Sequence, residues 1–131
     1  MTVGSVSSFE ADAFAREWAQ AWNARDLDRV LAHFSDAIVF SSPKAVDAVG
    51  QPTVHGKPAL RAYWERALTQ ISALEFIIVA AMWDGSMRRL AIIYDRKVNG
   101  RADRAIELLT FDAGGLVTAG EVFYGVTPTT A

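Results

Sequence analysis

The chain has 131 residues, of which 51% are hydrophobic and 21% are charged, and its net charge is −2. This composition predicts one folded domain spanning residues 1–131, with an ordered core at about residues 8–126, and argues against intrinsic disorder. With this slightly negative net charge, the chain is not expected to have the basic surface that binding to nucleic acid or to an anionic membrane requires. We therefore expect neither as a partner.

The chain contains no cysteine, which excludes a disulfide framework, a thiolate nucleophile and a zinc–thiolate site. Its N-terminus lacks the basic start and apolar run of a signal peptide. The longest apolar run, residues 76–83, is far too short to cross a bilayer. We therefore expect a cytoplasmic protein.

The N-terminal segment predicts two helices that meet at a tight corner. The first begins at a capping box formed by Ser7 and Glu10. Its buried face has residues at helical spacing: Phe14, Trp18, Ala21 and Trp22. Asp26 is suited to cap the second helix, and His33 in its last turn would interact favourably with the helix dipole. The inward face of the second helix is predicted to be Leu27, Val30, Leu31 and Phe34.

A strand, a loop and a third helix are predicted next. Residues 37–42 favour a strand that Pro43 stops, and residues 44–52 are predicted to form a loop. A brief second strand at residues 53–55 precedes the third helix, whose first position suits Pro58. The apolar face of this helix comprises Leu60, Tyr63, Trp64, Ala67, Leu68 and Ile71.

The second half of the chain predicts a four-stranded antiparallel meander. The dipeptides Asp84-Gly85 and Asn99-Gly100, and the turn at residues 112–115, are strong hairpin signals between apolar runs. They delimit strands at about residues 73–83, 87–98, 101–111 and 116–126. Because such strands exceed the usual length of about five to six residues, we expect the sheet to twist and curl.

These elements predict an α+β fold in the order α-α-β-β-α-β-β-β-β. A curved, mixed or antiparallel sheet of about six strands would wrap as a cone around the three helices and enclose an apolar interior. The outer face of the sheet also carries apolar residues such as Ile106 and Leu108. We therefore expect a homodimer in which two copies pair through this outer face.

Glu107 is the first catalytic candidate because it lies in the middle of an otherwise apolar strand. Alternation along the strand places its side chain on one face with Ala105, Leu109 and Phe111. Burial there would raise its pKa, so that the carboxyl could work as an acid or a base near neutral pH. The alternative is a structural buried acid that accepts a hydrogen bond from a tryptophan N–H or a tyrosine hydroxyl.

The ligand-binding candidates combine an apolar body with a polar tip, or provide space. The aromatic candidates are Trp18, Tyr63, Trp64 and Tyr94, for which plain core packing is the alternative. Gly120 would leave room for a ligand beside Val122 and Tyr124, or would mark a β-bulge. Arg96, on the face of Tyr94, would lie at the cavity mouth or within a solvated stripe of basic residues.

His55 is the second catalytic candidate, since it lies beside the entry to the third helix and imidazole titrates near neutral pH. The alternative is a structural histidine. The two histidines occupy separate elements without an acidic cluster beside them, so we predict no metal site, and no cofactor is indicated.

Three motifs, together with the order of elements, support a family resemblance. They are Trp-Asn-Ala-Arg-Asp-Leu-Asp at residues 22–28, His-Gly-Lys-Pro-Ala-Leu at residues 55–60, and Ile-Glu-Leu-Leu-Thr-Phe at residues 106–111. The chain resembles the SnoaL-like, ketosteroid-isomerase-like superfamily, which includes nuclear transport factor two, over about residues 14–125. The resemblance implies the cone fold but no single activity, because this fold hosts isomerases, cyclases, epoxide hydrolases, dehydratases and binding domains.

The resemblance places Glu107 at the oxyanion-stabilising acid of ketosteroid isomerase and Trp18 at its tyrosine. The base aspartate falls on Ser41 or Ser42, before Pro43, so steroid isomerase activity is not expected; Ser42 is kept as a ligand-binding candidate. The Asp-Arg-Asp set of an epoxide hydrolase would need Asp103, Arg104 and Glu107. Arg104 should face away from the other two.

Three functions fit these observations. In the first, the chain is an acid–base enzyme of the isomerase, cyclase, dehydratase or hydrolase type that acts through Glu107 on a small hydrophobic molecule with a polar group. Alternatively, it binds such a molecule without catalysis, or it is a dimerisation or interaction module whose cone is filled by its own aromatic residues. An open cavity with Glu107 in its wall would favour the first two functions.

Overall fold

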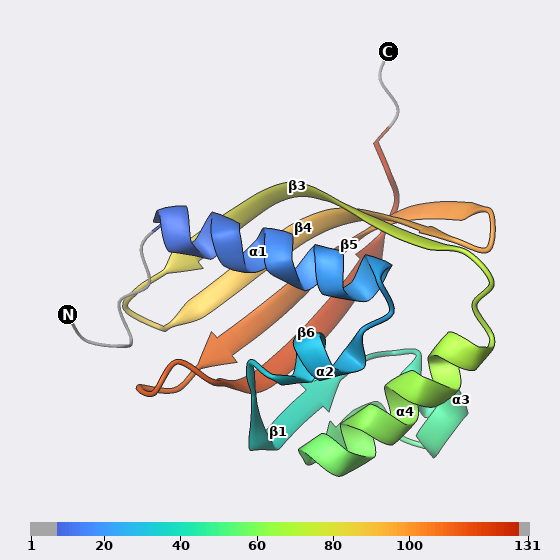
Figure 1. The fold of residues 1–131 in the computed structure, drawn as a ribbon, viewed down its shortest axis with the longest axis horizontal. Helices are drawn as coiled ribbons and strands as arrows, with labels where there is room; N and C mark the ends of the chain where they lie inside the picture. The colour runs from blue at the N-terminus through green and yellow to red at the C-terminus, as the bar shows by residue number, and fades with distance from the viewer. Residues whose placement is uncertain (1–7, 129–131) are drawn as a thin grey trace.

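Six strands form one mixed sheet in the computed structural model, which describes residues 8–128 (Figure 1). Their order across the sheet is β2-β1-β6-β5-β4-β3. The strands are β1 (Phe34–Ser41), β2 (Thr53–His55), β3 (Leu74–Asp84), β4 (Arg89–Val98), β5 (Arg101–Phe111) and β6 (Val117–Gly125). Only the β1–β6 pair is parallel. The structure therefore confirms the predicted α+β fold with a mixed sheet.

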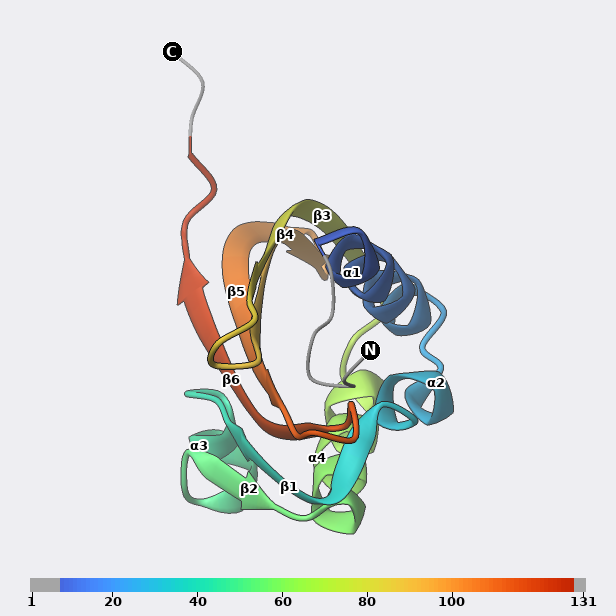
Figure 2. The same ribbon diagram turned by 90° about the vertical axis from the view of Figure 1, so that its left-hand side faces the viewer.

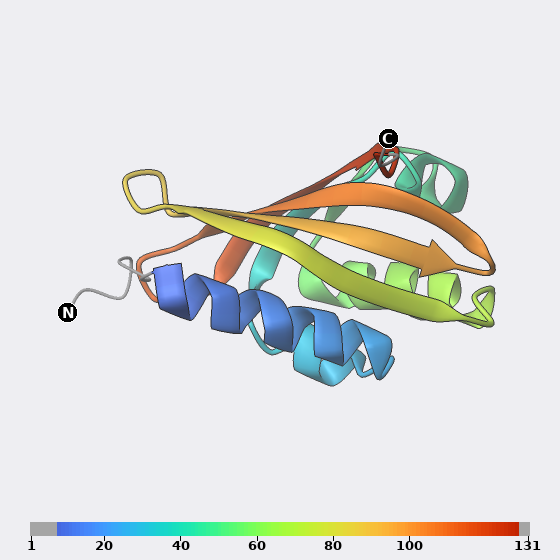
Figure 3. The same cartoon turned by 90° about the horizontal axis from the view of Figure 1, so that it is seen from above.

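The helices lie on the concave side of the sheet. They are α1 (Ser8–Asn23), α2 (Leu27–Leu31), α3 (Ala45–Val49) and α4 (Lys57–Thr69). Figure 2 shows the sheet curling around an interior that α1 and α2 close on one side and α4 closes below. Seen from above, α1 runs along the long, twisted strands β3 and β4 (Figure 3). No helix within residues 8–128 has the length and hydrophobicity needed to span a bilayer.

The first two helices follow the prediction except at Phe34 and His33. The Asp26 side chain caps α2 by accepting a hydrogen bond from the backbone N–H of Arg29 at 3.2 Å, as predicted. The helix ends at Leu31, so Phe34 begins β1 and His33 lies in the connection, where its ring contacts Phe14 at 5.0 Å. The helical assignments of Phe34 and His33 were therefore wrong, and the cap at Ser7 lies outside the described residues.

The segment expected to be a loop, residues 44–52, contains the short helix α3. Gly50 ends this helix with a φ of 83°, and its backbone N–H bonds to the carbonyl of Val46 at 2.9 Å. The helix lies beside α4 at the rim of the interior, as Figure 1 shows. Its position brings Lys44, the residue before α3, to the edge of the site described below.

The hairpin signals place the strands β3 to β6 within about two residues of the predicted bounds. Register fixes what faces the interior: Ile92 of β4 and Val122 of β6 flank Glu107 of β5 on either side. Tyr94 lies opposite Ala105 on the same face. The period of two along each strand therefore directs Glu107 inward, as the sequence predicted.

Aromatic side chains from the helices and β3 pack over this inner face. Trp22 of α1 contacts Trp64 of α4 with ring centroids 4.8 Å apart, and Trp18 stacks on Phe76 of β3 at 5.5 Å. Trp18 and Phe76 each contact Tyr94 at 4.8 Å. This cluster ties segments that are distant in the sequence into one roof above the sheet.

Candidate functional site

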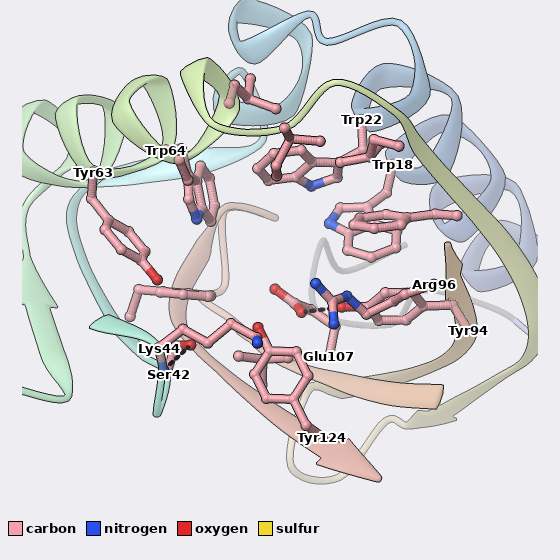
Figure 4. Close-up of a pocket in the computed structure, with 17 residues that line it drawn as sticks. Trp18, Trp22, Ser42, Lys44, Tyr63, Trp64, Tyr94, Arg96, Glu107 and Tyr124 are labelled. Carbon is pink, nitrogen blue, oxygen red and sulfur yellow. Dashed lines mark hydrogen bonds between the residues drawn. The ribbon is translucent and has the colours of Figure 1, made fainter. Parts of the chain in front are cut away.

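A cavity of about 120 Å³ lies between the aromatic roof and the concave face of the sheet. Figure 4 shows the side chains that line it, which come from α1, α4 and the inner faces of the strands. All predicted site residues except His55 and Gly120 line this cavity: Trp18, Ser42, Tyr63, Trp64, Tyr94, Glu107, Val122 and Tyr124. The interior is therefore neither solidly packed nor widely open.

Glu107 lies in the wall of the cavity, and only 4% of the residue is exposed to solvent. The Tyr94 hydroxyl donates a hydrogen bond to its Oε1 at 3.2 Å. Burial raises the pKa of Glu107 from its usual 4.5 to about 8, and the hydrogen bond from Tyr94 and the charge of Arg96 oppose this rise only in part. At neutral pH the carboxyl is therefore mainly protonated.

The phenols around Glu107 remain protonated as well. Burial raises the pKa of Tyr94 well above its usual 10, raises that of Tyr124 to about 12, and raises that of Tyr63. Among the described residues that line the cavity, Glu107 is the only carboxylic acid. The site therefore offers one group that changes its protonation state near neutral pH, surrounded by neutral hydroxyls.

Two indole N–H groups face the cavity without partners. Within residues 8–128, the Nε1 atoms of Trp18 and Trp22 are buried and form no hydrogen bond. Figure 4 shows both nitrogens directed toward the central space that the second carboxyl oxygen of Glu107 also faces. Leaving a buried donor unsatisfied costs about 1–3 kcal/mol. A ligand with a hydrogen-bond acceptor would recover part of that cost.

Charged residues surround the mouth of the cavity. Arg96 donates from Nη1 to both carboxylate oxygens of Asp103 at 3.0 Å, and 12% of its side chain is exposed. The ring of Tyr124 contacts the guanidinium of Arg96 at 4.8 Å and the Nζ atom of Lys44 at 4.7 Å. Arg104 pairs instead with Asp95 at 2.8 Å. Because Arg104 does not line the cavity, the Asp-Arg-Asp set of an epoxide hydrolase is not assembled.

Comparison with known proteins identifies the family. The sequence profile of the SnoaL-like domain matches residues 15–119. The chain belongs to the SnoaL-like family. The solved structure of a SnoaL-like protein from Burkholderia thailandensis is 32% identical in sequence, with a TM-score of 0.82 over 92% of this chain and 98% of that protein.

More distant structures share the fold of this SnoaL-like domain. An NTF2-like protein from Burkholderia pseudomallei is 21% identical, with a TM-score of 0.74 over 95% of this chain and 92% of that one. TerC, co-crystallized with polyporic acid, is 15% identical, with a TM-score of 0.71 over 90% of this chain and 91% of that one. No curated protein sequence is significantly similar to the chain.

Two of the residues predicted to belong to the site do not line the cavity of this SnoaL-like domain. His55 is exposed on β2 and does not line the cavity, so the structure does not bring this catalytic candidate together with Glu107. Gly120 provides no room for a ligand, because a Cβ atom there would lie 3.0 Å from Cδ1 of Phe40 and 3.3 Å from Cδ2 of Leu109. The missing side chain instead leaves room for the ring of Phe40, which the parallel pairing of β1 with β6 places beside Gly120.

Other lining residues had a weaker signal in the sequence or none. Trp22 belongs to the predicted apolar face of the first helix, but nothing distinguished it from core packing. Lys44 follows Pro43 in a segment predicted to be a loop, so its place at the mouth depends on tertiary structure. Within residues 8–128 of the SnoaL-like domain, no group of three or more His, Cys, Asp or Glu side chains is arranged to hold a metal ion.

The buried carboxyl predicts how stability depends on pH. The folded protein holds a proton on Glu107 that the unfolded chain releases near pH 4.5, so the stabilising contribution is lost as pH rises toward the folded pKa of about 8. Between about pH 5 and pH 8, the free energy of unfolding should fall by up to about 1.4 kcal/mol per pH unit relative to Glu107→Gln. Urea unfolding of both proteins at several pH values measures this difference. A difference that does not change with pH would contradict the assignment.

Proposed function

We propose that this SnoaL-like domain binds a small, mainly apolar molecule with a hydrogen-bond acceptor and acts on it by general acid–base chemistry through Glu107. The observation that supports this most strongly is a neutral carboxyl group in the wall of a cavity. A carboxylic acid with a pKa near the working pH can both deliver and recover a proton. Perturbed acids of this kind are concentrated at functional sites.

The surrounding groups suggest how a proton transfer would proceed. The neutral Glu107 carboxyl would donate its proton to a carbonyl or hydroxyl oxygen of the ligand. The resulting carboxylate would keep the hydrogen bond from the Tyr94 hydroxyl at Oε1. The unpartnered indole N–H groups of Trp18 and Trp22 would donate hydrogen bonds to the ligand oxygen and hold it beside the carboxyl. The Glu107 carboxylate would then take a proton from the neighbouring carbon of the ligand, which restores the neutral acid. This leaves an enol when the acceptor is a carbonyl, or a double bond when a protonated hydroxyl has left as water.

The volume of the cavity limits what it can hold. Cavities for drug-sized ligands measure about 300–1,000 Å³, whereas an apolar cavity of about 150 Å³ is enough for benzene. The cavity of about 120 Å³ therefore suits a group close in size to a single ring. A protein of the same fold, TerC, was co-crystallized with polyporic acid, which is consistent with small-molecule binding by this fold.

A non-catalytic binding protein is the second candidate function. It is favoured by the lack of a second acid or base, since Glu107 is the only carboxylic acid among the described lining residues. The phenols cannot replace that base, because burial raises the pKa values of Tyr63, Tyr94 and Tyr124. On this account Glu107 would serve only to donate a hydrogen bond to the ligand.

Glu107→Gln separates the two candidates, because glutamine can still accept the hydrogen bond from Tyr94 but cannot transfer a proton at neutral pH. With the ring-sized ketone cyclohexanone in D₂O, we expect the wild type to accelerate exchange of the α-protons, measured by ¹H NMR. The variant should lose at least about 100-fold of that acceleration. Ligand-observed NMR should show binding to both proteins.

Equal acceleration by the wild type and Glu107→Gln would contradict the catalytic role. Binding to both proteins without accelerated exchange in either would support the non-catalytic alternative. Native mass spectrometry of the purified protein complements this experiment, because a ligand that co-purifies with the domain would replace cyclohexanone as the probe.

We also propose that two copies pair through the outer face of the sheet. Register places Ala80, Ile93, Ile106 and Phe123 in one lateral row across β3, β4, β5 and β6. Ile106 and Phe123 are 36% and 47% exposed, and Ile77, Val79 and Met82 of β3 are also exposed. Exposed apolar residues clustered on one face of this kind usually mark an interface.

A charge within this row should separate the two copies. We expect Phe123→Lys to convert a dimer into a monomer, while Val49→Lys, an equally exposed site on α3, leaves the dimer intact. Sedimentation equilibrium measures the mass, and circular dichroism checks that each variant is folded. A wild-type protein that sediments as a monomer at micromolar concentration would refute the proposed interface.

A further inference from the structure

We infer that the ligand of this cavity is a small carboxylic acid whose ring enters the cavity while its carboxylate binds outside the mouth, at Lys44 and Arg66. This inference rests on the proposed function, because it specifies the class of molecule that the same cavity takes. It is derived from a second hollow and from the charges that line it.

The cavity opens into a larger hollow of about 440 Å³, here called the outer groove. Both spaces share five lining residues, so the outer groove is the continuation of the cavity beyond its mouth: Lys44, Tyr63, Ala67, Ile71 and Arg96. The remaining walls of the groove come from α3, from the last turns of α4 and from the end of β4. A molecule larger than one ring would therefore extend into this groove.

The charges of the outer groove are mainly positive. Its lining contains Lys44, Arg66 and Arg96 but only one acid, Asp47. Asp103 already neutralises Arg96, with both oxygens 3.0 Å from Nη1. The three cations and the two acids, Asp47 and Asp103, together leave one net positive charge in a protein whose overall charge is −2. The groove is therefore the opposite in sign to the molecule as a whole.

Lys44 and Arg66 are the cations available to a ligand. Within residues 8–128, neither forms an ion pair with a carboxylate. Arg66 donates one hydrogen bond, from Nη1 to the carbonyl of Ala48 at 3.3 Å. The ammonium of Lys44 lies over the ring of Tyr124 at 4.7 Å, which holds it at the mouth (Figure 4).

The interior determines the orientation of the ligand. A carboxylate is disfavoured in the cavity for the same reason that Glu107 holds its proton there: burial destabilises the charged form. The indoles of Trp18 and Trp22 instead offer apolar surface and N–H donors to a neutral group. A ring with an acidic side chain is therefore expected to enter with the ring first and to leave the carboxylate at the outer groove.

Two probes of nearly equal shape test this inference, 3-(4-oxocyclohexyl)propionic acid and its neutral counterpart, 3-(4-oxocyclohexyl)propionamide. Both carry a ring ketone that can accept a hydrogen bond in the cavity. Isothermal titration calorimetry at pH 7 and low salt should show the acid binding to the wild type at least about fivefold more tightly than the amide. The preference should weaken as salt is added, since exposed charges are screened. Indole N–H resonances of Trp18 and Trp22 should shift with both probes, which reports entry of the ring.

Lys44→Gln and the double variant Lys44→Gln/Arg66→Gln should remove most of the preference for the acid while leaving amide affinity within about twofold. The matched control is Lys97→Gln, which makes the same change in net charge at a lysine that pairs with Glu75 outside the groove. This control should keep the preference.

The outcomes separate the inference from the proposed function. If the wild type binds the acid and the amide equally, or if Lys97→Gln lowers the preference as much as Lys44→Gln does, the acid site is wrong while the cavity remains a ligand site. If neither probe binds and the indole resonances do not move, both the acid site and the ring-sized ligand site are overturned.

Discussion

The burial of one carboxyl group is the constraint on which the account of this domain depends. Glu107 is flanked by Ile92 and Val122 across the sheet and receives one hydrogen bond, from Tyr94. A charged carboxylate in such surroundings would lack sufficient solvation, so the group keeps its proton near neutral pH. The same desolvation that makes Glu107 unfavourable for folding when ionised suits it to the proton transfer proposed above.

The curvature of the sheet and the aromatic roof together create the space around this group. The long strands β3 to β6 supply one wall, while Trp18 and Trp22 of α1 and Trp64 of α4 supply the other. The contact between the Trp22 and Trp64 rings joins α1 to α4 above a cavity of about 120 Å³. Beyond the mouth, the environment changes from apolar to positive at Lys44 and Arg66, so a bound molecule would meet different chemical requirements at its two ends.

Local patterns in the sequence were enough to predict the sheet and the orientation of Glu107. Hairpin dipeptides fix where strands turn. The period of two then assigns each side chain of β5 to the inner or the outer face of the sheet. Four residues were misassigned or missed because their places depend on tertiary contacts: Phe34, Lys44, His55 and Gly120. Gly120 is an example: its role follows from the closeness of Phe40, which a parallel β1–β6 pairing brings from a distant part of the chain.

The most direct test of this account is the pKa of Glu107 itself, measured by ¹³C NMR of the side-chain carboxyl in protein labelled at glutamate, with the resonance assigned by its loss in Glu107→Gln. The carboxyl is expected to titrate at about pH 8 and to be neutral at pH 7. A pKa close to the usual 4.5 would mean that the group is ionised and solvated, and would contradict both the acid–base role and the apolar interior on which it rests.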